Sequence, residues 1–304
     1  MKTLGILILP VLLIPTGFSC SEATQQKSSL SKPSAEAFHD YWFQGLAEIS
    51  RFQLEQARYG EIRKGDAVLI FVTEEFLVDR QVKSEQGKAS GAVPVLKLNF
   101  IKKFKTGIYP YSIMSSMFTP VELTNYPKTL KVTTSIQEWC GHTFTQLNLR
   151  KNSYQVMTRS YYMNEADQNY VLENVQLEDN IWALIRIAPA SLATGDIELI
   201  PGSQFSRLKH IDQKKQNATA SLDVKADLCI YSIQYKDIPR TLTIRFKNHF
   251  PFEIMGWEET SSLDKDAGQS ILRTRATRTH TMLVDYWNKK GLNDTSYRNK
   301  LGLP

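Results

Sequence analysis

The feature that most constrains the fold is a period of two in hydrophobicity that recurs along most of the chain. In residues 95–104, the apolar Leu96, Leu98 and Phe100 alternate with the polar Lys97 and Asn99. Successive side chains of a strand point to opposite faces, so this pattern predicts a strand with one buried face. Similar or strongly β-prone runs occupy residues 46–58, 67–72, 111–118, 131–139, 143–149, 154–162, 169–177, 196–200, 204–211, 218–224, 228–235, 241–247, 252–259 and 271–286.

Short polar connections, rich in Gly, Pro, Asn and Asp, separate nearly all of these runs, which predicts antiparallel neighbours. We therefore expect an all-β fold, an up-and-down meander that forms a large curled barrel or a sandwich. A short helix near 180–186 is expected, with acidic residues and Asn at its start and Pro189 after it. About fourteen strands are too many for one filled small barrel. They must enclose a cavity, form two sheets, or divide into two lobes near 178–195.

The N-terminus has the three parts of a secretory signal: a basic start, a short apolar segment and small residues before Cys20. We predict a signal peptide over 1–19, a lipidated Cys20 that begins a flexible tether over 20–37, and one β-rich domain over 38–304. Residues 35–43 also have helical spacing. The expected location is the cell envelope, as a lipoprotein of the outer membrane or facing the periplasm, and a membrane partner is reached through the N-terminal lipid. Ordinary secretion with a free Cys20 is the alternative.

The remaining cysteines, Cys140 and Cys229, form an even pair that an oxidising envelope would allow to bridge. Two buried, unpaired thiols are the alternative. No cysteine or histidine spacing suggests zinc, so we expect no metal site.

Composition and motifs give little support for an enzyme. The 304 residues carry a formal charge of +6, and 42% are hydrophobic, which excludes a disordered chain. No serine-hydrolase, phosphate-loop or dinucleotide motif is present, so we expect no catalytic residue and no cofactor. Export makes nucleic acid an unexpected partner. A hydrolase whose site is assembled from distant strands remains the enzymatic alternative.

Aromatic residues make up 11% of the chain and could line a ligand cavity or fill the core. The candidates for ligand binding are Trp139, His142, Tyr162 and Trp257, with Trp139 and His142 expected at a pocket mouth. The C-terminal region is basic, with Lys289, Lys290 and Arg298 among its residues. Such charge attracts phosphates, anionic lipid headgroups or acidic glycans, and it also occurs as solvated surface charge.

Four stretches resemble a known family: Gln56–Glu61, Ala67–Glu74, Thr106–Met114 and Gln137–His142. Together they are similar to a family of uncharacterised lipoproteins of Bacteroidota, over about residues 38–259. Its members sometimes carry the label "septum formation inhibitor Maf". True Maf proteins are α/β nucleotide pyrophosphatases with a Ser-Pro-Arg-Arg motif, and neither feature is present here. The resemblance implies an exported protein built as one unit, and it implies no site.

These observations lead to one main functional hypothesis and two alternatives. The main hypothesis is a non-enzymatic envelope lipoprotein that binds an amphipathic or lipid-like ligand, or an envelope partner. The first alternative is a glycan-binding or structural module, which an exposed tryptophan beside a polar groove would favour. The second is the hydrolase.

Overall fold

The computed structural model describes residues 30–173, 175–262 and 272–303. The predicted signal peptide (1–19), Cys20 and most of the predicted tether lie outside these residues. The described chain begins at Leu30, which already packs against the main hydrophobic core. Helix α1 (Ala35–Trp42) follows, and the Ser34 side chain accepts a hydrogen bond from the Ala37 amide at 3.1 Å as its N-cap. The helical spacing is thus confirmed, and the body starts earlier than the predicted tether boundary at 37.

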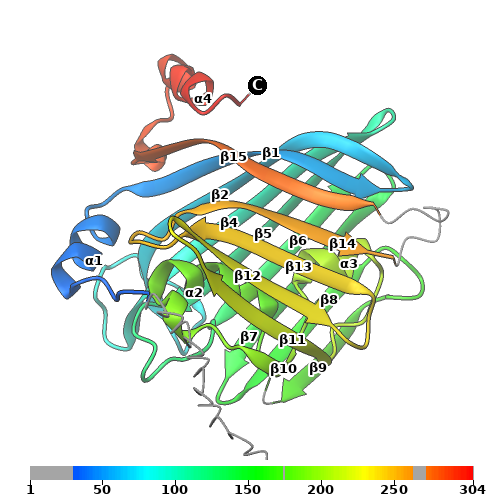
Figure 1. Ribbon diagram of the computed structural model, residues 1–304, viewed down its shortest axis with the longest axis horizontal. Coiled ribbons are helices and arrows are strands. Elements are labelled where there is room, and N and C mark those ends of the chain that lie inside the picture. The colour runs from blue at the N-terminus through cyan, green and yellow to red at the C-terminus, as the bar shows by residue number, and fades with distance from the viewer. Residues whose placement is uncertain (1–29, 174, 263–271, 304) are drawn as a thin grey trace, which may run out of the picture.

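Fifteen strands form one antiparallel sheet (Figure 1). The first group is β1 (Ala47–Arg58), β2 (Glu61–Leu77), β3 (Val82–Lys83), β4 (Ala92–Thr106), β5 (Tyr109–Pro120), β6 (Lys131–Glu138), β7 (Gly141–Arg150), β8 (Ser153–Ser160) and β9 (Gln168–Glu173). The second group is β10 (Gly195–Leu199), β11 (Gln216–Val224), β12 (Leu228–Tyr235), β13 (Arg240–Lys247), β14 (Ile254–Ser261) and β15 (Arg273–Val284). Each group is a meander, and the pairing of β1 with β15 joins the two into one sheet. The predicted antiparallel meander is confirmed.

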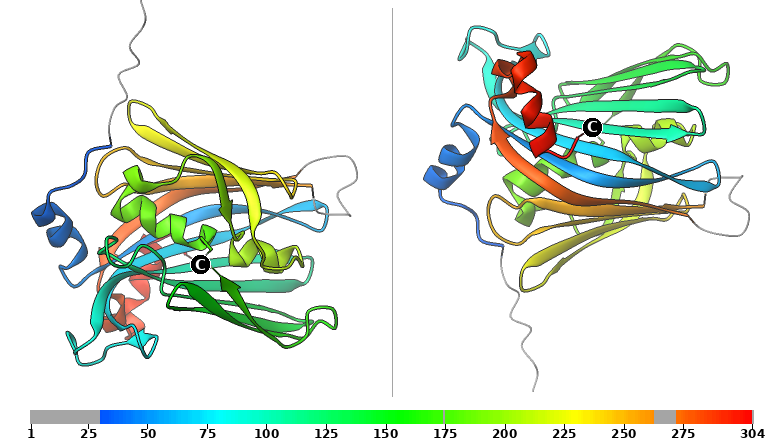
Figure 2. Two further views of the ribbon diagram at one scale, coloured as in Figure 1. Left: turned by 90° about the horizontal axis from the view of Figure 1, so that it is seen from below. Right: turned by 90° about the horizontal axis from the view of Figure 1, so that it is seen from above.

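The sheet curls strongly without closing, and its two edge strands are β9 and β10 (Figure 2). The chain passes from one edge to the other across the concave side through η1 (Glu178–Asn180), α2 (Ile181–Ile187) and η2 (Pro189–Ser191). An isolated bridge between Leu177 and Ile200 lies on this crossing. The expected barrel is therefore an open, curled sheet. The predicted division near 178–195 is this crossing, and it does not separate two sheets.

One predicted strand, residues 204–211, is wrong. The structure has helix α3 (Ser203–Leu208) there, followed by a turn. Phe205 and Leu208 are both buried, and their spacing of three places them on one face of a helix. The short helix predicted near 180–186 is confirmed as η1 and α2.

The concave side is filled by aromatic side chains. Trp182 of α2 packs between strands: its ring centroid lies 5.0 Å from Phe100 and 5.2 Å from Trp257. Trp257 also contacts Phe52 at 4.9 Å, and the space left beside this cluster is about 30 Å³. Burying each such side chain contributes roughly 1.5–3 kcal/mol. Trp257 is 1% exposed, so its expected role in ligand binding is corrected to a role in the core.

Two buried arginines join the crossing segment to the sheet. Arg186 of α2 donates to both Glu48 carboxylate oxygens, at 2.6 and 2.5 Å, and to the Pro251 carbonyl oxygen at 2.9 Å. Arg240 of β13 binds both Glu178 carboxylate oxygens and also donates to Glu259 at 2.6 Å. Buried charges require such full pairing because desolvation is costly. These pairs fix where the helices lie within the curled sheet.

The C-terminal segment lies on the opposite, convex side (Figure 2). It contains η3 (Tyr286–Asn288), η4 (Leu292–Thr295) and α4 (Ser296–Lys300). Among the described residues, no helix combines the length and apolar character needed to span a membrane.

Candidate functional site

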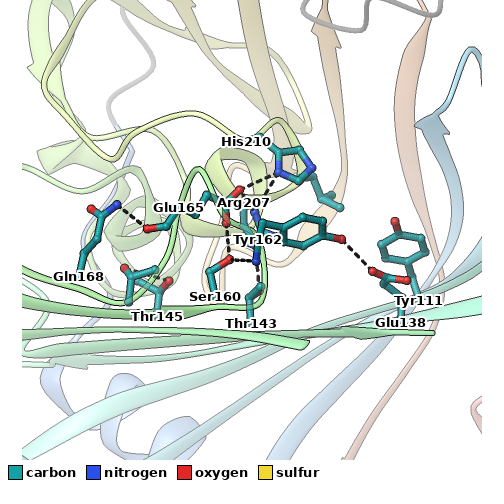
Figure 3. Close-up of polar contacts among 12 residues, drawn as sticks. Tyr111, Glu138, Thr143, Thr145, Ser160, Tyr162, Glu165, Gln168, Arg207 and His210 are labelled. Carbon is teal, nitrogen blue, oxygen red and sulfur yellow. Dashed lines mark hydrogen bonds and ion pairs between the residues drawn. The ribbon is translucent and has the colours of Figure 1, made fainter. Parts of the chain in front are cut away.

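A polar pocket of about 870 Å³ opens where the ends of β7 and β8 approach α3. One wall is the β8–β9 connection, residues 161–167, and the other is α3 with the turn that follows it (Figure 3). Thr145 and Thr158 contribute from the concave face of the strands. We call this hollow the polar pocket. It is large enough for a small-molecule ligand of ordinary size.

Glu165 and Arg207 join the two walls. The Arg207 guanidinium donates to a Glu165 carboxylate oxygen and, through Nε, to Thr143 Oγ1 at 2.9 Å. Glu165 also accepts from Ser160 Oγ at 2.7 Å and lies 2.7 Å from His210 Nδ1. Burial alone would raise the pKa of Glu165, but these hydrogen bonds and the Arg207 charge outweigh burial and lower it. Glu165 is therefore a carboxylate at neutral pH, and it holds the β8–β9 connection against α3.

Tyr162 forms the side of the pocket nearest the sheet. Its ring lies 4.7 Å from the Arg207 guanidinium carbon and 5.1 Å from the His210 ring. Its hydroxyl donates to Glu138 Oε1 at 2.9 Å. Burial, followed by the hydrogen bond and charge of Glu138, raises the pKa of Tyr162. The ring is thus held on three sides and offers a rigid apolar face beside polar groups.

Ser203 forms the floor of the pocket and connects it to the buried network. Its hydroxyl donates to Asp179 Oδ2 at 2.7 Å, and its amide donates to the same carboxylate. Burial, then the charge of Glu178, raises the pKa of Asp179 to about 7. Gln213 Nε2 donates a hydrogen bond to the Ser203 hydroxyl oxygen at 3.1 Å. A carboxyl with this pKa suits general acid–base chemistry, but Ser203 is only 2% exposed and covers it.

The backbone around the pocket adopts unusual conformations. Ala166 has φ 47° and His210 has φ 54°, the left-handed region that non-glycine residues seldom occupy. Gly202 is required by space, because an added Cβ would lie 2.5 Å from Glu178 Oε1. Strained residues of this kind cluster at functional sites. Both walls of the pocket contain one.

The structure places only one of the four candidate ligand-binding residues in this pocket, namely Tyr162. Trp139 is 68% exposed in the β6–β7 turn, and His142 is exposed on β7. Trp257 lies in the core, as described above. Trp139 and His142 are therefore near the pocket in sequence and strand position, but neither lines it.

The possible disulfide between Cys140 and Cys229 is absent, and the alternative of two buried thiols holds for Cys229 alone. Cys140 is exposed in the β6–β7 turn, Cys229 is buried in β12, and both thiols are free. The hydrogen bond and charge of Glu138 raise the pKa of the exposed Cys140 thiol. Cys140 is therefore a poor nucleophile at neutral pH, because the thiolate is the reactive form.

Sequence reasoning missed Glu165, Arg207 and His210. The polar run of residues 163–168 stood out only as a connection between two predicted strands. Arg207 and His210 fell inside the wrongly predicted strand over 204–211, where alternation would have separated them onto opposite faces. The Pro201-Gly202 pair before a serine was the available signal for a turn into a helix.

In the part of the chain that the structure describes, no group of three His, Cys, Asp or Glu residues could hold a metal ion. No family model, curated protein or solved structure matches the chain in the comparisons made. The resemblance to the Bacteroidota lipoproteins therefore stays a prediction.

Proposed function

We propose that this chain is a cell-envelope lipoprotein, anchored through Cys20, whose sheet binds a polyhydroxylated ligand, a glycan, in the polar pocket. The observation that carries the proposal is the composition of that pocket. Its lining contains side-chain amides, carboxylates, hydroxyls and two tyrosines around a space of about 870 Å³. Sugar rings present hydroxyls that both donate and accept, together with apolar faces, and such a lining matches both.

Two further details support a hydroxyl-bearing ligand. Gln213 Oε1 is buried in the pocket wall and has no hydrogen-bond partner within the described residues. A buried acceptor without a partner calls for an explanation, and a ligand hydroxyl supplies one when the Gln213 amide turns toward the pocket. The side-chain amide of Asn164 and the carboxylate of Asp212 are exposed on the pocket rim, where they can exchange water for a ligand.

Exposed aromatic rings lie beside the pocket. Tyr161 is 65% exposed, and its ring packs edge-on against Tyr162 with centroids 5.3 Å apart. Trp139 is 68% exposed in the β6–β7 turn, within 6.4 Å of the Tyr109 ring. Exposed rings near a polar groove favour the glycan hypothesis over a lipid held in the interior, and here Tyr161 belongs to the pocket wall while Trp139 lies in the neighbouring β6–β7 turn. Such rings can extend the binding surface for an oligosaccharide.

The concave interior gives less support to the amphipathic-ligand hypothesis. Its aromatic side chains pack on one another, and the hollow beside Trp257 is about 30 Å³. That volume holds a water molecule and not an acyl chain. The hydrolase alternative gains little from the groups near the pocket: the Asp179–Ser203 pair is buried, and the Ser160 hydroxyl donates to Glu165 and not to His210.

The test is isothermal titration calorimetry of the purified protein with a panel of trisaccharides: neutral, N-acetylated and uronic acid types. We expect at least one type to bind, with affinity lowered about tenfold or more by Asn164→Ala or Gln213→Ala, since each loses about one ligand hydrogen bond. Asn152→Ala is the matched control: Asn152 is equally exposed, in the β7–β8 turn at the far end of the same strands.

Failure of every trisaccharide type to bind, or an equal loss in Asn152→Ala, would overturn the glycan proposal. The anchor is tested separately by incorporation of labelled fatty acid, which Cys20→Ala should abolish. A protein that binds a trisaccharide without taking up the label would be a secreted binder.

A further inference from the structure

A second hollow lies on the convex face, under the C-terminal segment. The strands β1, β2, β4 and β15 turn apolar side chains outward here: Ile49, Val68, Ile70, Ile101, Met282 and Val284. Residues 285–303 fold across this patch and leave a pocket of about 450 Å³ between α4 and the sheet. Figure 2 shows α4 on the side of β15 and β1 opposite α2. We call this hollow the outer pocket.

The segment over the outer pocket is attached by few contacts. Leu301 is its best-buried residue, at 6% exposure, while Tyr297 and Leu303 are half-buried. Most other residues of η4 and α4 are exposed, including Leu292 at 91%. Segments with few buried apolar contacts open at low cost in free energy. The C-terminal segment can therefore lift to admit a ligand.

Charged side chains line the rim of the outer pocket: Lys103, Lys289 and Arg298, together with Asp66 and Asp294. Lys289 is paired with Asp285, whose Oδ1 lies 3.0 Å from its Nζ. Asp66 is neutralised by Arg51, whose Nη2 lies 2.6 Å from its Oδ1. Lys103 is exposed, and its ammonium makes no hydrogen bond or ion pair with another described residue. An anionic group at this rim would find a cation without a competing partner.

A second apolar hollow provides the comparison. The seam groove, of about 500 Å³, lies between α2 and the edge strand β10, and Leu184 and Ile197 are among its apolar lining residues. Its lining contains no lysine or arginine, and its one charged residue is Glu198. Apolar area alone therefore does not distinguish the two hollows, but the charge at the rim does.

We propose that the outer pocket binds a single-chain amphiphile with an anionic headgroup. The alkyl chain lies between α4 and the apolar side chains of the sheet, and the headgroup lies at Lys103. Removal of the alkyl chain from water supplies the non-directional part of the affinity, and the Lys103 ammonium supplies the preference for an anionic headgroup. The site is on the opposite face from the polar pocket and does not depend on the glycan proposal.

The test uses purified Cys20→Ser protein, so that neither an attached lipid nor detergent competes. Four probes of one chain length are titrated: dodecanoate, dodecyl phosphate, dodecyltrimethylammonium and dodecyl maltoside, all below their micelle concentrations. We expect both anionic probes to bind at least tenfold more tightly than the cationic probe. The ratio of dodecanoate to dodecyl phosphate affinity then separates a carboxylate from a phosphate headgroup. Amide hydrogen exchange in residues 285–303 should slow when an anionic probe is bound.

Two variants and one control locate the site. Ile101→Trp should fill the outer pocket and weaken binding at least tenfold, while Ile197→Trp, in the seam groove, should leave it unchanged. Lys103→Glu should weaken the anionic probes severalfold and leave dodecyl maltoside unchanged, which keeps the test decisive if Ile101→Trp fails to fold. Equal binding of all four probes, or loss only in Ile197→Trp, would overturn the proposal.

Discussion

Arg240 and Arg207 each form an ion pair with a glutamate, one in the interior and the other at the polar pocket. Each donates to a glutamate, and each guanidinium lies against an aromatic ring, Phe205 for Arg240 and Tyr162 for Arg207. They differ in solvation. The side chains of Arg240 and Glu178 are 1% and 4% exposed, whereas those of Arg207 and Glu165 are 11% and 21% exposed. One pair is part of the interior, and the other forms the wall of a pocket.

The difference teaches what each pair does. In the interior no water can replace a lost partner, so the Arg240 network must be complete, and it holds the crossing segment in the sheet. At the polar pocket, water reaches the groups and the backbone is strained at Ala166 and His210. That pair holds a loop in place while leaving neighbouring groups available to a ligand.

The largest expected effect follows removal of the interior arginine. Arg240→Ala removes the guanidinium that binds the buried Glu178 and the half-buried Glu259, so we expect a loss of about 3–5 kcal/mol in the free energy of unfolding. Urea denaturation measures it. Arg207→Ala is the paired control, and equal losses for the two variants would contradict the division between interior and pocket.

The second prediction concerns the pH dependence of stability. Burial and the Glu178 charge raise the pKa of Asp179 to about 7 in the folded chain, from 3.8. The folded protein then keeps a proton that the unfolded chain has already lost above pH 4. Stability from this group is therefore fully present below pH 4 and is lost as the pH rises through 7.

Asp179→Asn should remove this dependence, since Asn still accepts a hydrogen bond from the Ser203 amide. The stability of the unsubstituted protein relative to the variant should fall by about 2–3 kcal/mol between pH 5 and pH 8. Urea denaturation at several pH values measures the difference. Parallel stability curves for the two proteins would show that Asp179 titrates normally.

Removal of the pocket arginine should have a smaller effect on the free energy of unfolding. Arg207→Ala should cost only about 1–2 kcal/mol, because water can solvate Glu165, which keeps Ser160 and His210 as partners. The loss of stability should be confined to the β8–β9 connection. Amide hydrogen exchange should become faster in residues 161–167 and stay unchanged in β13. Faster exchange throughout the sheet would mean that Arg207 supports the whole fold.

The comparison also explains what sequence could and could not provide. Alternation located most strands, since each has one buried face, and it predicted the meander because the turns are short. It could not show that the sheet stays open. Closure would require β9 to pair with β10, and the alternation within each strand does not indicate whether two edge strands pair with each other. The interior charges are hidden for a related reason. Glu178 and Arg240 are 62 residues apart, and only the folded chain brings them together.

The candidate site could be predicted only in part from the sequence. Tyr162 was singled out and lines the polar pocket. Trp257 was grouped with it on residue type alone, because an aromatic in a strand has the same sequence signature whether it faces a ligand or the core. Arg207 was lost when 204–211 was interpreted as a strand. Phe205 and Leu208 are three residues apart, which fits one face of a helix and not the alternation of a strand, but the stretch is too short for the helical period to stand out.

The smallest expected effect on stability comes from Trp139, and it is the sharpest test of the pocket's reach. Trp139 is 68% exposed, so Trp139→Ala should change the free energy of unfolding by less than about 0.5 kcal/mol. A monosaccharide held within the polar pocket should bind the variant with unchanged affinity, whereas a trisaccharide that extends to the β6–β7 turn should bind severalfold more weakly.

Trp287→Ala is the control, because Trp287 is also exposed but belongs to the C-terminal segment on the convex face. Calorimetry with both sugars on both variants separates the outcomes. If Trp139→Ala and Trp287→Ala lower trisaccharide affinity alike, the turn is no part of the site. A monosaccharide loss in Trp139→Ala alone would instead mean that the turn shapes the pocket itself.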